Sequence, residues 1–143
     1  MKYEATILQN AVLKEAAAFG EKFQSLKTIA IFGSVARGEE NPNSDIDIAF
    51  EWLKVEEIAT KGLLADFQKA QAELEVWKSY LEQQFSRPVS LHLDHPYQLQ
   101  KDAAEEAILA AIAASPLKIG KAVLAPTASV KSSGAQMLRP LLK

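Results

Sequence analysis

The chain of 143 residues contains no cysteine. It therefore has no disulfide, thiolate zinc site or thiol nucleophile, and any metal ion must be bound through oxygen or imidazole ligands. Long apolar runs are also absent, because charged residues such as Lys14 and Glu15 interrupt them before the roughly 18–20 residues that a membrane span requires. We expect no membrane-spanning helix, no secretory signal and a cytoplasmic location.

Acidic residues are missing from the C-terminal part of the chain. Residues 116–143 contain five Lys and Arg and no acid, whereas residues 1–115 contain 18 acids against 11 Lys and Arg, a net charge of −7. An acidic body is a poor match for a nucleic-acid backbone, so we do not expect direct nucleic-acid binding. The chain is 48% apolar and 24% charged, which is typical of a soluble globular domain of this length.

Hydrophobic periodicity predicts an α/β domain over residues 1–115. Apolar side chains recur every three or four residues in three predicted helices, at 4–23, 55–85 and 96–115. The second of these is one long helix or two helices broken near Gly62. Short apolar or alternating runs predict three strands, near 28–32, 45–51 and 88–93. We expect a small mixed β-sheet with helices packed mainly on one face.

Residues 116–143 show no clear periodicity and are rich in Gly, Pro, Ser and Lys. We predict that this stretch is a basic C-terminal arm that becomes ordered only against a partner.

Two short motifs carry the chemistry that the sequence predicts. Gly33 and Ser34 follow a buried strand, where glycine lets the backbone approach a phosphate and serine at a helix N-terminus adds a hydroxyl and amide donors. Asp45 and Asp47 alternate along the next strand, so their carboxylates project from one face about 7 Å apart and can share a divalent cation. Alone, each motif is more often an ordinary turn or a solvated strand face. Together, a phosphate cradle and a metal clamp are the two halves of a nucleotidyl-transfer site.

The segment that contains both motifs resembles the signature of the DNA polymerase β-like nucleotidyltransferase superfamily. It reads Gly33-Ser34, then ten residues, then DIDI at residues 45–48. More narrowly, GSVARG at 33–38 followed by NSDID at 43–47 is similar to the minimal nucleotidyltransferases (MNT), which are commonly paired with a HEPN ribonuclease toxin. The resemblance implies a polymerase β palm-like fold.

This resemblance also implies a site, cofactors and a partner. Gly33 and Ser34 would bind the triphosphate of ATP, and Asp45 and Asp47 would bind Mg²⁺. The implied reaction is transfer of AMP from ATP to a hydroxyl group, most simply that of a tyrosine, on a HEPN-type toxin. The chain would then be a protein adenylyltransferase that forms a hetero-oligomer with the toxin and acts as its antitoxin.

Serine occupies the position of a third family carboxylate. In the family, an apolar-Asp-apolar unit on the next strand helps to activate the acceptor hydroxyl, whereas residues 89–91 here read Val-Ser-Leu. Ser90 has no anionic oxygen and cannot act as a base unaided. His92, about 7 Å along the same strand face, is the candidate catalytic base, and the alternative is a strand histidine without a role. Asp94, about 13 Å along, is too far away and suits a helix cap.

Arg37 has two possible roles. It is a candidate contact for a phosphate or for an acidic acceptor protein, and an ordinary surface arginine fits equally well.

The sequence also leaves two alternatives to AMP transfer to a toxin. In one alternative function, Ser90 has removed catalysis and the chain neutralises its toxin by binding and occlusion. In another, the chain transfers a nucleotide to an antibiotic hydroxyl, although such enzymes generally hold the acceptor with a further domain.

Overall fold

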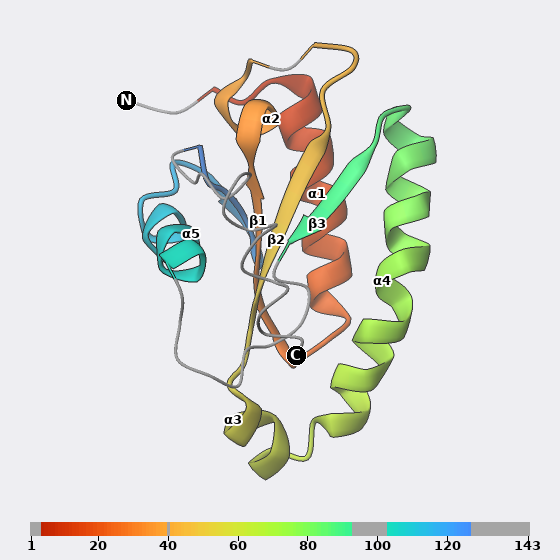
Figure 1. The fold of residues 1–143 in the computed structure, drawn as a ribbon, viewed down its shortest axis with the longest axis vertical. Coiled ribbons are helices and arrows are strands. Elements are labelled where there is room, and N and C mark those ends of the chain that lie inside the picture. The colour runs from red at the N-terminus through yellow and green to blue at the C-terminus, as the bar shows by residue number, and fades with distance from the viewer. Residues whose placement is uncertain (1–3, 40, 93–102, 127–143) are drawn as a thin grey trace.

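Five strands form one mixed sheet in the order β3-β2-β1-β5-β4 (Figure 1). The computed structural model describes residues 4–39, 41–92 and 103–126. The strands are β1 (Leu26–Phe32), β2 (Ile46–Trp52), β3 (Val89–His92), β4 (Lys118–Ile119) and β5 (Ala122–Leu124). β1 runs antiparallel to β2 and parallel to β5, while β3 runs parallel to β2 and β4 antiparallel to β5. The predicted α/β class with a small mixed sheet is confirmed.

The helices are α1 (Ile7–Glu21), α2 (Gly33–Arg37), α3 (Val55–Thr60), α4 (Leu64–Phe85) and α5 (Ala103–Ala113). The stretch predicted as one or two helices is two, because Gly62 adopts a left-handed φ of 69° between α3 and α4. The beginning of the helix expected from residue 96 lies outside the described residues. Within the described part of the chain, no helix is long and apolar enough to cross a membrane.

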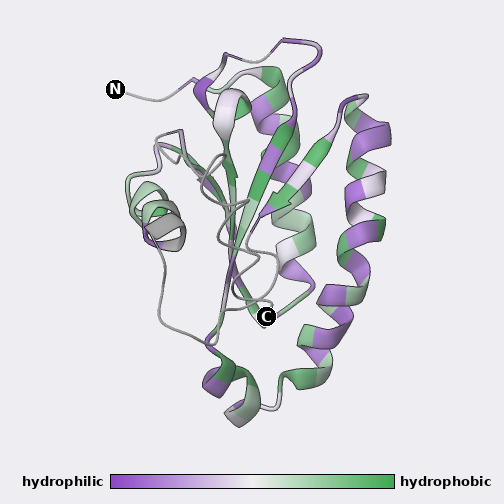
Figure 2. Cartoon of the chain, viewed as in Figure 1, coloured by the Kyte–Doolittle hydropathy of each residue, from purple (hydrophilic) through white to green (hydrophobic). Residues whose placement is uncertain are grey.

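The larger core lies between one face of the sheet and helices α1 and α4. Apolar side chains of β1 and β2 face these helices, and among them Ile31 and Ile48 are completely buried. Phe19 of α1 stacks on Trp77 of α4, with ring centroids 4.4 Å apart, and this contact joins the two helices over the sheet. In Figure 2, β1 and β2 are largely hydrophobic, whereas α4 is mostly hydrophilic with interspersed hydrophobic residues, as expected for a helix with one buried side.

A second and smaller core lies on the opposite face of the sheet, beneath α5. It consists mainly of small side chains, with Ala30 of β1 and Ala49 of β2 packed near Ala111 of α5. Phe32 belongs to this face as well. Two helices therefore cover one face and α5 the other, which agrees with the expected placement of helices mainly on one face.

The chain between residues 118 and 124 belongs to the sheet and not to a C-terminal arm. β5 pairs with β1, with Val123 opposite Ala30, and all three of its side chains are buried. The prediction of a separate arm from residue 116 is wrong here, because a strand of three residues is too short to show a period and its pairing with β1 decides its conformation. Residues 127–143 of the predicted arm lie outside the described residues.

Candidate active site

Gly33 and Asp47 meet where β1 ends and β2 begins. In the antiparallel register Asp47 lies opposite Phe32, so the next residue, Gly33, begins α2 at the level of the carboxylate. Gly33 has a left-handed φ of 74°, and a Cβ built on it would overlap the Asp47 carboxylate, with Cγ only 3.2 Å away. The backbone conformation and the close approach both require glycine at this position.

Asp45 and Ser90 complete this side of the site. Asp45 directly precedes β2 and is exposed, whereas Asp47 is partly buried. Ser90 on β3 pairs with Asp47 in the parallel register, and its hydroxyl donates to Oδ2 of Asp45 at 3.4 Å. Ser90 therefore lies beside both aspartates, at the place where the family resemblance implies a third carboxylate.

His92 lies against Asp47 on the same face of the sheet. Its Nε2 is 3.6 Å from Oδ1 of Asp47, which is longer than a hydrogen bond. Nε2 is buried and has no hydrogen-bond partner among the described residues, and the ring packs edge-on against Phe32 with centroids 5.0 Å apart. The histidine is thus beside the predicted metal ligand, and its role as a base stays a prediction. Asp94 lies outside the described residues.

Ser34 is the second residue of α2, directly after Gly33, and is partly buried. The helix has only five residues and ends at Gly38, whose left-handed φ of 72° lets its N–H donate back to the carbonyls of Ser34 and Val35. Gly33 and Ser34 are therefore the first two residues of a short helix that begins beside Asp47.

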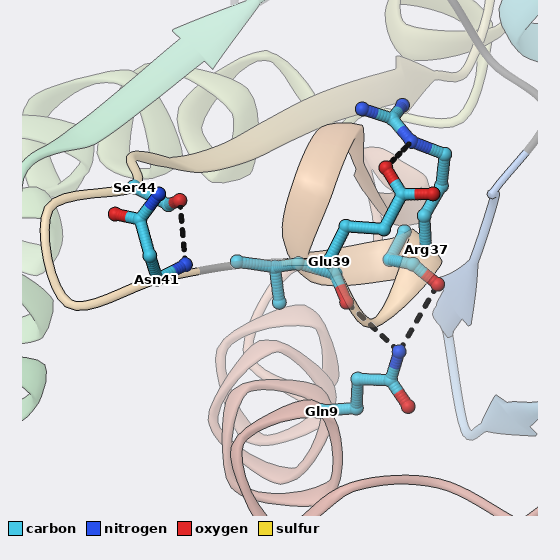
Figure 3. Close-up of polar contacts among 7 residues, drawn as sticks. Gln9, Arg37, Glu39, Asn41 and Ser44 are labelled. Carbon is cyan, nitrogen blue, oxygen red and sulfur yellow. Dashed lines mark hydrogen bonds and ion pairs between the residues drawn. The ribbon is translucent and has the colours of Figure 1, made fainter.

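Arg37 lies in the last turn of α2 and is paired with an acid. Its Nε donates to Oε1 of Glu39 at 2.9 Å, and both side chains are exposed (Figure 3). A phosphate or an acidic partner would have to compete with Glu39 for the guanidinium. The predicted contact of Arg37 with nucleotide stays a prediction.

Two residues near the site have no counterpart among the sequence-predicted residues. Gln9 of α1 donates from Nε2 to backbone carbonyls of α2, and Arg87 donates to the carbonyl of Asn41 at 3.1 Å in the loop that leads to Asp45 (Figure 3 shows Gln9 and Asn41). Thr6 and Gln9 form a capping box, whose spacing is visible in the sequence and marks a helix start. Neither contact with the site region has a sequence signal, because each joins segments far apart in the chain.

The capacity of this site for a metal rests on Asp45 and Asp47. Within residues 4–39, 41–92 and 103–126, no group of three or more His, Cys, Asp or Glu side chains is arranged to hold a metal ion. Two carboxylates nevertheless fit a Mg²⁺ ion, because Mg²⁺ beside nucleotides is usually bound by one or two carboxylates, substrate phosphates and water. The donor set suits a metal that binds together with its nucleotide.

The mixed sheet, the glycine at the end of β1 and the aspartate pair at the start of β2 define an α/β protein of the nucleotidyltransferase class. The family model described as nucleotidyltransferase domain matches residues 13–112, and the chain belongs to this family. The matched stretch contains every predicted site residue from Gly33 to His92. No curated protein and no solved structure matches the chain. The family membership supports nucleotidyl transfer as the general activity.

Proposed function

We propose that the protein is a Mg²⁺-dependent nucleotidyltransferase that transfers AMP from ATP to a hydroxyl group of a partner protein. The proposed partner is a HEPN-type toxin modified on a tyrosine, so that the chain acts as its antitoxin. The observation that carries the chemistry is the close approach of Gly33 to the carboxylate of Asp47, with Asp45 two residues away. The antitoxin role is supported by the resemblance of residues 33–47 to the minimal nucleotidyltransferases.

The proposed reaction forms one bond and breaks one. The acceptor hydroxyl oxygen bonds to the α-phosphorus of ATP, the bond from this phosphorus to the oxygen shared with the β-phosphate breaks, and pyrophosphate leaves. Bound Mg²⁺ supplies neutralisation of the charge that develops on the phosphates. Gly33 and Ser34 hold the phosphates in line with the acceptor, and the hydroxyl proton passes to Nε2 of His92, which has no hydrogen-bond partner among the described residues.

Binding of Mg-ATP tests the carboxylate pair. Asp45→Asn and Asp47→Asn each remove one anionic ligand, so calorimetry should show binding that is weaker by about tenfold or more. Glu51→Gln is the matched control, because Glu51 lies on the same strand but pairs with Lys27 at 3.6 Å. Unchanged affinity in both aspartate variants, or equal loss in Glu51→Gln, would contradict the assignment.

Transfer of label tests the reaction. With Mg²⁺, ATP labelled at the α-phosphate and a HEPN-type toxin as the proposed acceptor, a tyrosine of that toxin should become labelled, and Asp47→Asn should abolish the labelling. His92→Gln should slow labelling by about 10²-fold or more without weakening Mg-ATP binding. Transfer from γ-labelled ATP would contradict AMP transfer, and a wild-type rate in His92→Gln would remove His92 from the mechanism.

The serine at position 90 supports occlusion of the toxin as a second candidate function. Ser90 supplies no third carboxylate beside Asp45 and Asp47, so catalysis would be weak and the chain would neutralise its partner by binding alone. In that case Asp45→Asn and Asp47→Asn would still inhibit the partner, and the partner would carry no label. Loss of inhibition in both variants would favour the enzymatic function.

A further inference from the structure

Gln9 is a buried polar side chain that joins α1 to α2. It is 1% exposed, and its Nε2 donates to the carbonyl of Val35 at 2.8 Å and to that of Ala36 at 3.0 Å (Figure 3). Its Oε1 accepts the backbone N–H of Thr6 at 2.9 Å, as part of the capping box that begins α1. A single amide therefore connects the first turn of one helix to the last turn of another.

The chemistry of these partners requires an amide at position 9. One end of the side chain meets an N–H donor and the other meets two carbonyl acceptors, and only a primary amide offers an acceptor and two donor hydrogens in this arrangement. A glutamate of the same shape would bring a carboxylate oxygen against two carbonyl oxygens. A methionine would fill the space and leave the carbonyl of Ala36 without this donor, at the usual cost of a buried group that loses its hydrogen bond. The carbonyl of Val35 would keep the N–H of Gly38 at 3.1 Å but lose the bond from Gln9.

The helix held by Gln9 is the one that begins at Gly33 and Ser34. α2 has five residues, and Val35 and Ala36 are both fully buried in the larger core, which fixes the helix on one side. The two bonds from Gln9 fix the direction in which its last carbonyls point. Because the helix is short, a rotation at these carbonyls changes the position of Ser34 and of the Gly33 backbone beside Asp47.

We propose that Gln9 is a positioning residue for the nucleotide-binding turn, which it holds in place through the carbonyls of Val35 and Ala36. The inference rests on the proposed binding of Mg-ATP at Gly33 and Ser34. Gln9 itself does not touch the nucleotide, so its loss should change how well the turn binds phosphate and not the chemistry at Asp45 and Asp47.

Calorimetric titration with Mg-ATP, well below the melting temperature of each protein, tests this role. Gln9→Glu and Gln9→Met should weaken Mg-ATP binding about tenfold, and Gln9→Glu should be the worse of the two. Thr6→Ala is the matched control, because it breaks the capping box of the same helix but keeps the backbone N–H that Gln9 accepts and both bonds to α2. Thr6→Ala should lower the melting temperature and leave the affinity for Mg-ATP unchanged. If Gln9 contributed only to stability, the Gln9 variants would behave like Thr6→Ala and would also keep their affinity.

The outcomes separate this inference from the proposed function. If wild-type protein does not bind Mg-ATP, both are overturned. If wild-type protein binds but both Gln9 variants bind within twofold of it, only the positioning role is overturned. If neither variant folds, NMR of the wild-type protein tests the inference instead. The side-chain NH₂ resonances of Gln9 should shift on addition of Mg-ATP. Unchanged resonances under saturating Mg-ATP would overturn the inference.

Discussion

Gly33 and Gly62 share a backbone conformation but differ in what surrounds them. Their φ angles are 74° and 69°, both in the left-handed region that L residues rarely adopt. A Cβ on Gly33 would overlap the Asp47 carboxylate, whereas a Cβ on Gly62 would have no described heavy atom within 4 Å. The two positions therefore separate the cost of the backbone conformation from the cost of crowding the site.

Substitution of the two glycines by alanine should give different results. Gly62→Ala should lower the free energy of unfolding by about 1–2 kcal/mol, the cost of a left-handed alanine, and leave Mg-ATP binding intact. Gly33→Ala should cost more and also abolish Mg-ATP binding, because the methyl group displaces Asp47. Urea unfolding and calorimetry would measure both effects, and equal losses of stability with retained binding would contradict the close approach.

Ser90→Asp should make the stability of the protein depend on Mg²⁺. The new carboxylate would lie beside Asp47 and near Asp45, so without metal the like charges should lower the free energy of unfolding by about 1 kcal/mol. Addition of Mg²⁺ should restore this loss, and transfer of AMP should become faster than in the wild type. Thermal unfolding with and without Mg²⁺ measures the effect. Ser79→Asp, on the exposed side of α4, adds the same charge elsewhere and should show no Mg²⁺-dependent difference.

At the scale of elements, Asp66 joins α4 to the turn between α1 and β1. One carboxylate oxygen accepts the backbone N–H and the hydroxyl of Ser25, at 2.9 and 2.6 Å, and the other accepts the N–H of Gln24 at 3.0 Å. Desolvation raises the pKa of Asp66, but the hydrogen bonds from Ser25 and Gln24, with Lys121 nearby, outweigh it and hold the pKa below its ordinary value of 3.8. The ionised carboxylate is therefore stabilised by folding.

Asp66→Asn should destabilise the protein in a pH-dependent way. A depressed pKa in the folded state contributes stability above the unfolded pKa, and this stability is lost as the pH falls through the folded pKa. We expect a loss of about 1–2 kcal/mol in the free energy of unfolding at pH 7, shrinking below the ordinary pKa of 3.8. Urea titrations from pH 7 to pH 3 test this, and a difference that does not depend on pH would contradict the assignment. Asp66 lies away from Gly33, so Mg-ATP binding should be unchanged.

The sequence allowed prediction of elements whose patterns are local. The strands β1, β2 and β3 follow from apolar or alternating runs, and Gly62 marked a break as one of two alternatives for the stretch 55–85. The short motifs predicted that Gly33 and Asp47 belong to one site, and the structure adds their direct contact. β5 could not be predicted, because its three residues become a strand only by pairing with β1. Gln9 contacts Val35 and Ala36, which lie 26 and 27 positions further along the chain, and no periodic pattern in the sequence predicts such a contact.

At the scale of the whole molecule, the sheet depends on a strand from the far end of the sequence. β5 lies between β1 and β4, so it occupies an interior position although it begins only at Ala122. Ala122 and Leu124 belong to the larger core and Val123 to the smaller one. A single short strand thus contributes to both faces of the fold, and the domain extends beyond the predicted boundary at residue 115.

Truncation tests whether the domain ends at residue 115, as predicted, or only after β5. A chain that ends at Ser115 loses β4 and β5, including a fully buried leucine and a nearly fully buried valine, each worth about 1.5–3 kcal/mol, together with the hydrogen bonds to β1. This loss approaches the entire stability of a typical domain, about 5–15 kcal/mol, and it turns β1 into an exposed apolar edge that favours aggregation. We expect no cooperative urea transition for this chain, whereas a chain that ends at Pro126 keeps every described strand and should unfold cooperatively and bind Mg-ATP. A cooperative transition of the shorter chain, followed by circular dichroism, would show that the sheet does not need β5 and would restore the boundary at residue 115.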